Sequence, residues 1–213
     1  MRPYLLLRLL LAFCCLSAVS CVVGRREMPL PVPAGARPQV QGQASITSVV
    51  DQRRFQNKPS DPSSPSMDGD VTQATPAELS RIIGRQRGGY GKAMGDIALA
   101  HGKSVPAKVT EIVTEALRRR GYEATGNSSN TLKVDVQKFW GWMSPGAWAI
   151  TLEAEIECLV IVRRDGRTRQ FTVRGYGENV CQAAGDTNWN EAYDWAVEDF
   201  MKKLDQELAA SAF

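Results

Sequence analysis

The stretch WAITLEAEIECLVIVRRDGRTRQFTVRGY, residues 148–176, decides the fold of this chain. Within residues 148–162 the even positions are apolar, and within residues 151–157 the odd positions are polar. This alternation predicts a strand with one buried face, because successive side chains of a strand point to opposite faces. We therefore expect Trp148 to lie in the core with the residues of the same parity: Ile150, Leu152, Ala154, Ile156, Cys158, Val160 and Val162.

The dipeptide DG at residues 165–166 ends this strand and predicts a tight turn, since both central residues of a type I′ turn need a positive φ angle. With these residues as the loop, Arg164 faces Arg167, and Phe171 lies opposite Val160. Apolar residues then face apolar residues, so the hydrophobic pattern and the turn chemistry indicate one register independently. The sequence therefore predicts one long β-hairpin.

The same register separates two cysteines. Cys158 faces Val173, whereas Cys181 would face Ile150 if the strand continued that far. Eight residues of strand span roughly 26 Å, and a disulfide needs α-carbons within about 7 Å of each other. We predict that Cys158 and Cys181 form no disulfide.

Residues 1–20 have the pattern of a signal peptide. Arg2 and Arg8 precede an apolar stretch at residues 9–19, which is too short to span a bilayer. It leads into the sequence AVSC, which resembles the bacterial lipobox, where the cysteine is lipidated and becomes the mature N-terminus. We predict lipidation of Cys21; the alternative is an ordinary signal peptide with an incidental cysteine.

The segment after the cysteine predicts where the protein is held. Acyl chains on Cys21 would anchor it in a membrane, and Val22, in place of aspartate, favours by resemblance the outer membrane, facing the periplasm. Residues 21–42 are rich in proline, so we expect a lipid-anchored tether that is extended and unpacked.

Composition limits the classes of partner. The chain has 213 residues with 43% hydrophobic content, enough for one core. Of its 26 basic residues, Arg2 and Arg8 lie in the signal peptide, so the mature chain has 24 against 23 acidic residues. A chain so close to neutral is not expected to bind nucleic acid.

Two further strands and two helices complete the predicted fold. Strands are expected at residues 44–50 and 131–138, and amphipathic helices at 104–120 and 188–208. The order strand, helix, three-strand meander, helix predicts an α+β fold. We expect a two-layer sandwich with a mixed sheet of about four strands and two helices on one face.

Residues 43–213 are expected to form a single domain with a long loop insertion at about residues 56–95. Thr75 and Glu78 form a capping box that predicts a short helix inside this insertion. Asn188 and Glu191 form a second pair, which predicts the start of the closing helix.

A tryptophan-rich connection follows the second strand. Phe139 and Trp140 are neighbours, so they cannot both point inward from a regular strand. We expect at least one of Trp140 and Trp142 to be exposed and to form, with Met143, a contact surface for a protein or a membrane interface. The alternative is a small core beneath the 56–95 insertion.

The residues favour a non-catalytic protein that needs no cofactor or metal. His101 is the one histidine and has no cysteine or histidine at ligand spacing, and Cys181 has no histidine partner. Glu153, Glu155 and Glu157 form one row, which could serve paired-carboxylate chemistry. A solvated face with cross-strand salt bridges to Arg174 explains this row with fewer assumptions.

Several features together resemble the YajG-like family of uncharacterised bacterial envelope lipoproteins. These features are the lipobox at residues 18–21, the strand that ends in DQR at 51–53, the helix that closes with RGY at 120–122, the meander and the C-terminal helix. The resemblance implies an envelope lipoprotein and supplies no catalytic residues. We expect an interaction or scaffold module for an envelope protein partner; the alternative is a protein that binds lipid or lipopolysaccharide.

Overall fold

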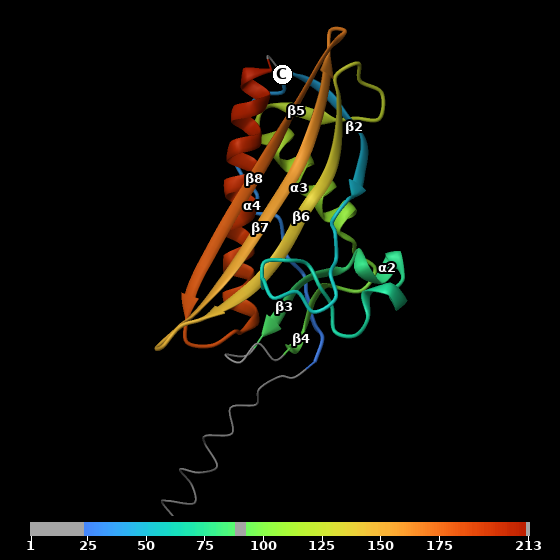
Figure 1. Ribbon diagram of the computed structural model, residues 1–213. Coiled ribbons are helices and arrows are strands. Elements are labelled where there is room, and N and C mark those ends of the chain that lie inside the picture. The colour runs from blue at the N-terminus through green and yellow to red at the C-terminus, as the bar shows by residue number, and fades with distance from the viewer. Residues whose placement is uncertain (1–23, 88–92, 212–213) are drawn as a thin grey trace, which may run out of the picture.

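The computed structural model describes residues 24–87 and 93–211 (Figure 1). The predicted signal peptide and Cys21 lie outside the described residues. Within those two ranges, no helix has the length and apolar character needed to cross a membrane.

A meander of three long strands forms the centre of the sheet: β6 (Thr131–Pro145), β7 (Ile150–Arg164) and β8 (Arg167–Cys181). The register of β7 and β8 is the predicted one. It runs without interruption from the pair Arg164 and Arg167 at the turn to the pair Ile150 and Cys181. Asp165 and Gly166 have φ angles of 50° and 74°, as a type I′ turn requires. The predicted hairpin is confirmed and continues beyond residue 176.

The predicted burial of Trp148 is wrong. Pairing between β6 and β7 ends at Pro145 and Ile150, so Trp148 lies in the connecting turn and not in a strand. Its side chain is 91% exposed, whereas the other even-numbered residues from Leu152 to Val162 are buried in the core.

The sheet is larger than predicted, with eight strands among the described residues. Two groups of strands pair with the same edge of β6 (Figure 1). The first half of β6 pairs with β2 (Gly42–Asp51), and the start of β2 pairs in turn with the short β5 (Tyr122–Ala124). The second half pairs with β3 (Ile82–Arg87), followed outward by β4 (Ala93–Leu99) and β1 (Arg26–Met28).

The two long helices, α3 (Val105–Arg119) and α4 (Asp186–Ala210), cover one face of the sheet, as predicted. Ser104 caps α3, since its hydroxyl oxygen accepts a hydrogen bond from the Ala107 amide. The predicted capping pair of α4, Asn188 and Glu191, is wrong, because the helix begins earlier, after Gly185. The side-chain amide of Asn188 donates instead to the Ala183 carbonyl at 2.7 Å.

The predicted unpacked tether is wrong for the described residues 24–41. Residues of β1 extend the sheet, and Met28 and Leu30 are buried in the core. Beyond them, the Gly35 amide donates to Glu115 at 2.8 Å, and Arg119 donates to the Pro33 carbonyl at 2.6 Å. The burial of two large apolar side chains and these polar contacts to α3 hold the segment against the domain, although its prolines favour an extended backbone.

The expected loop insertion at 56–95 is also only partly a loop. It contains a 3-10 turn, η1 (Val71–Gln73), and the short helix α2 (Pro76–Leu79), which Thr75 caps as predicted. Its last part forms β3 and the start of β4, because Ile82 and Ile83 are buried strand residues.

Candidate functional site

The residues predicted to form a contact surface are buried. Trp140, Trp142 and Met143 are 0%, 7% and 8% exposed, so the prediction of an exposed surface is wrong. An irregularity in the pairing between Val136 and Lys138 shifts the parity of β6 at this point. Phe139 then packs in the main core, and Trp140 packs in a separate cluster on the other face.

This second cluster is the alternative that the sequence left open, a small core beneath the insertion. Trp140 makes an edge contact with the ring of Phe55 at 6.0 Å and donates its indole hydrogen to the Pro62 carbonyl at 3.0 Å. Trp142 packs against Tyr176 at 6.5 Å between ring centroids. The loop covers the sheet here, so these aromatic residues have a structural role.

In the row of Glu153, Glu155 and Glu157, the first two residues make ion pairs or hydrogen bonds with specific side chains. Glu155 is 3% exposed, which corrects the expectation of a solvated face. It pairs with Arg174 at 2.7 Å and with Lys138 at 3.1 Å. Glu153 accepts a hydrogen bond from the Tyr176 hydroxyl at 2.7 Å, and burial together with this carboxylate raises the pKa of Tyr176. The carboxylates therefore stabilise the outer face of the sheet through ion pairs and hydrogen bonds.

The remaining sequence candidates do not meet in one place. His101 lies in a turn, and no group of three potential metal ligands occurs within the described part of the chain. Cys158 and Cys181 are free thiols, and they lie opposite Val173 and Ile150 as the register predicts. Burial raises the pKa of the Cys158 thiol, which keeps it in its unreactive form.

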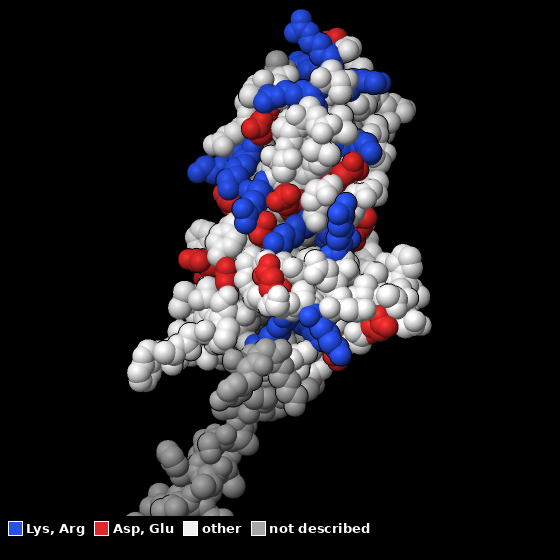
Figure 2. Space-filling view, viewed as in Figure 1, with Lys and Arg blue, Asp and Glu red and all other residues white. Residues whose placement is uncertain are grey.

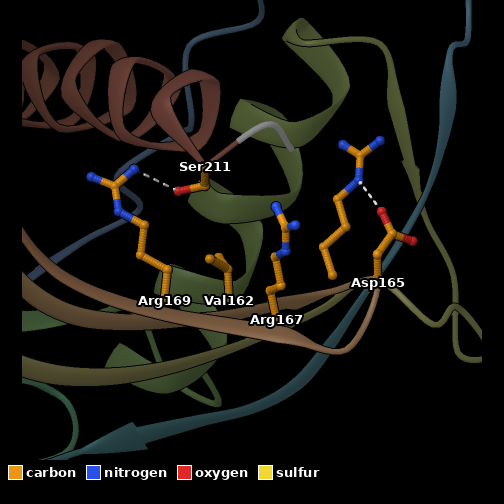
Figure 3. Close-up of a pocket in the computed structure, with 6 residues that line it drawn as sticks. Val162, Asp165, Arg167, Arg169 and Ser211 are labelled. Atoms are coloured by element: carbon orange, nitrogen blue, oxygen red, sulfur yellow. Dashed lines mark hydrogen bonds and ion pairs between the residues drawn. The ribbon is translucent and has the colours of Figure 1, made fainter.

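The tip of the β7–β8 hairpin forms a pocket that the sequence reasoning missed (Figure 3). Arg164 and Arg167 face each other beside the turn, and Arg169 faces Val162 further from it. The side chains of Arg167 and Arg169 rise from the sheet on the side of α4. The pocket has a volume of about 380 Å³ and is lined by Val162, Arg164, Asp165, Arg167, Arg169 and Ser211.

The ends of the helices and the strand period together create this pocket. Residues two apart in a strand share a face, so Arg167 and Arg169 must project on the same side. The helix α4 ends at Ala210, short of the turn, and the hairpin tip extends beyond it (Figure 1). The inner face of the tip is therefore left open beside Ser211.

The three guanidinium groups differ in how firmly they are held. Arg169 pairs with Glu207 at 2.8 Å and donates to the Ser211 hydroxyl at 3.0 Å. Arg164 donates to the Tyr122 hydroxyl at 3.1 Å and has the Asp165 carboxylate 3.5 Å away. Arg167 makes no hydrogen bond or ion pair with any residue that the structure describes.

This arrangement suits the binding of an anionic group. A guanidinium group presents donors in a planar fork that matches a carboxylate or a phosphate. Like charges directly opposite in a sheet repel each other, so an anion bound beside Arg167 would reduce its repulsion from Arg164. The predicted register already contained this signal, because it placed these two residues opposite each other.

The fold defines a class of protein, an α+β domain in which a long meander is covered on one face by two helices. A family model described as "Uncharacterized lipoprotein" matches residues 88–210. The chain therefore belongs to this family, the YajG family of lipoproteins, and is associated with the cell envelope. The resemblance found in the sequence is confirmed.

No match was found among curated proteins. Among solved structures, the chain is similar to a DUF330 protein from Xanthomonas campestris, with 15% identity, a TM-score of 0.49 and coverage of 88% of this chain and 96% of that one. It is also similar to a putative neuraminyllactose-binding hemagglutinin homolog from Helicobacter pylori, with 8% identity, a TM-score of 0.36 and coverage of 85% and 94%. At these scores the similarities support no conclusion about function.

Proposed function

We propose that this protein is a non-catalytic interaction module, anchored by lipid in the outer membrane and facing the periplasm. Its arginine pocket would bind an acidic segment of an envelope protein partner. The observation that carries the proposal is Arg167, which faces Arg164 in an open pocket and has no hydrogen bond or ion pair within the described residues. Among the described residues that line this pocket, Asp165 is the one carboxylate. A carboxylate of the partner would compensate this excess of positive charge.

The position of the pocket supports this assignment. Gly24, three residues after the predicted lipidation site Cys21, lies at the opposite end of the sheet, beside the start of β4. The strand β7 has 15 residues between these two ends, which corresponds to a length of about 45 Å. A protein anchored through Cys21 would therefore present the pocket to the periplasm and not to its own membrane.

The alternative of binding an amphiphile in an apolar cleft between sheet and helix lacks a corresponding space at β8. A Cβ atom added to Gly175 would lie 2.3 Å from the Ala196 carbonyl oxygen, and one added to Gly177 would lie 2.3 Å from that of Ala192. The helix α4 thus rests on the strand backbone itself. The close contact favours a packed core over a lipid-binding cleft at this place.

Photo-crosslinking in cells tests the role of the pocket. A photoreactive amino acid in place of Ser211, which lines the pocket, should capture a defined envelope protein. The Arg167→Glu variant should lose this crosslink. Arg163→Glu is the matched control, because Arg163 is also exposed but points to the other face of the same hairpin. Equal effects of both substitutions, or capture of lipid alone, would contradict the proposal.

The anchor is tested separately. The Cys21→Ala variant should remain unprocessed or become soluble, because the lipidated residue is lost. The measurement is membrane fractionation combined with the mass of the mature chain. A variant that stays in the membrane at the mature mass would show that the anchor lies elsewhere.

A further inference from the structure

The turn between β6 and β7 carries a tryptophan that almost entirely faces solvent. The Gly146 amide donates to the Ala149 carbonyl at 2.9 Å, which closes a tight turn with Ala147 and Trp148 at its tip. Trp148 is 91% exposed, the highest value among the exposed large hydrophobic residues of the described chain. Such a side chain contributes little to the packing of the core.

Two segments at this end of the meander contain no charged residue. Residues 143–152, which include the turn, and residues 179–185, which connect β8 to α4, contain no charged side chain. Val180, in the second of these segments, is 65% exposed. In Figure 2 the protrusion at the lower left, where Figure 1 places this turn, is uncharged.

The pairing of the strands places the turn at the end of the molecule where the described chain begins. The Gly24 amide donates to the Met94 carbonyl at 3.0 Å in β4, and β4 pairs with β3. In β3, Arg85 is level with Trp142 of β6. Gly24 is thus roughly level with the end of β6, and three strand spacings, about 15 Å, separate the two across the sheet.

Chain connectivity brings the predicted anchor close to the same level. Cys21 precedes Gly24 by three residues, and three residues reach at most about 11 Å. The turn with Trp148 extends past the last paired residue of β6, Pro145, in the direction of this end. A bilayer that holds acyl chains on Cys21 would therefore lie within reach of the turn.

We infer that the 145–149 turn is a second membrane contact, in which Trp148 inserts into the interface of the bilayer that holds Cys21. The inference rests on the lipidation in the proposed function. Tryptophan is favoured at the headgroup level, where its ring is partly apolar and its N–H group reaches polar partners. The small neighbours Gly146, Ala147 and Ala149 let the ring enter without burying a charge.

A bilayer fits this surface better than a protein partner does. A stable protein interface needs about 800 Å² on each side, whereas the turn presents a single large side chain on a narrow projection. Contacts at Cys21 and at Trp148 would restrict the tilt of the domain, because Gly24 and the end of β6 are about 15 Å apart across the sheet. The arginine pocket would then be held away from the membrane surface.

Fluorescence quenching by brominated lipids tests this inference. The lipidated full-length protein is purified from membranes and reconstituted in phosphatidylcholine vesicles that contain lipids brominated near the headgroup. Three of the five tryptophans, Trp140, Trp142 and Trp189, are at most 7% exposed and should contribute little. We expect the Trp148→Phe variant to lose most of the quenching and to melt at the wild-type temperature.

Trp195→Phe is the matched control. Trp195 is 59% exposed but lies nine residues into α4, which places it about 14 Å along the helix from its start. Quenching should persist in this variant. Equal quenching of the wild type and Trp148→Phe, or a loss only in Trp195→Phe, would overturn the inference.

Flotation of the same vesicles distinguishes failure of the anchor from failure of the contact. A wild-type protein that does not float with vesicles would refute the lipid anchor of the proposed function, and the inference would fall with it. A protein that floats while Trp148 is not quenched would leave the anchor intact and refute the turn contact alone.

Discussion

The guanidinium group of Arg53 donates a hydrogen bond to the carbonyl oxygen of Ile82 at 2.7 Å. It also donates to the carbonyl oxygens of Phe139 at 3.1 Å and Leu79 at 2.9 Å, and it pairs with Asp51 at 2.8 Å. Two strands, β2 and β3, pair with the same edge of β6, and they leave a gap between them. The buried arginine fills this gap and satisfies carbonyl groups that no strand reaches.

Replacement of Arg53 by alanine should destabilise the fold strongly. It removes five side-chain hydrogen bonds to four partners and leaves the Asp51 carboxylate without its charged partner, so we expect a loss of about 3–5 kcal/mol in the free energy of unfolding. Urea denaturation measures this loss. Arg54→Ala is the matched control, since Arg54 is exposed and its removal should cost less than about 0.5 kcal/mol. Similar costs for both variants would contradict a structural role of Arg53.

Replacement of Trp140 by alanine should lower the melting temperature by many degrees. The side chain is fully buried between the sheet and the loop, and loss of a buried tryptophan costs about 3–5 kcal/mol. Thermal unfolding followed by circular dichroism provides the measurement. Trp148→Ala should leave the melt unchanged, because Trp148 is in solvent. An unchanged melt of the Trp140 variant would restore the idea of a contact surface.

Replacement of Gly177 by valine should prevent α4 from packing on β8. A Cβ atom there would lie 2.3 Å from the Ala192 carbonyl oxygen and 2.5 Å from the Ala196 nitrogen, both in the helix backbone. We expect loss of the cooperative unfolding transition, because the helix must move away from the strand. Gly126→Ala should be neutral, since its Cβ would meet no atom within 4 Å. A cooperative transition at the wild-type midpoint in Gly177→Val would contradict the close contact.

The stability of the protein should depend on Glu115 in a pH-dependent manner. Hydrogen bonds from Arg118 lower the pKa of Glu115 from 4.5 to about 2, with further contributions from Gly35 and Arg119. A depressed pKa in the folded state stabilises the fold above pH 4.5, and this stabilisation is lost as the pH falls toward 2.

Glu115→Gln should therefore cost about 1–2 kcal/mol at pH 7 and much less near pH 2. Urea unfolding at several pH values measures the difference. Glu123→Gln, at an exposed position of β5, serves as the control. A cost of Glu115→Gln that is the same at both pH values would show that charge does not cause it.

The sequence by itself determined the central hairpin and the helical layer. The alternation before residue 165 and the DG turn both specify one register, so no tertiary information was needed to pair Arg164 with Arg167. The helix α3 was equally predictable from the sequence, because the capping residue Ser104 and the apolar stripe are local signals. Patterns of this kind act over a few residues and are therefore readable along the chain.

Only the tertiary structure decided which surfaces are covered and which are open. Trp140 is buried because a loop distant in sequence covers it, and Trp142 is buried against Tyr176 of β8. Trp148 is exposed because strand pairing ends before it. The strands β1, β3 and β4 carry weak local patterns and form because the edge of β6 offers unpaired hydrogen-bonding groups. The arginine pocket likewise depends on where α4 ends beside the hairpin tip, a relation between distant segments that local sequence patterns do not encode.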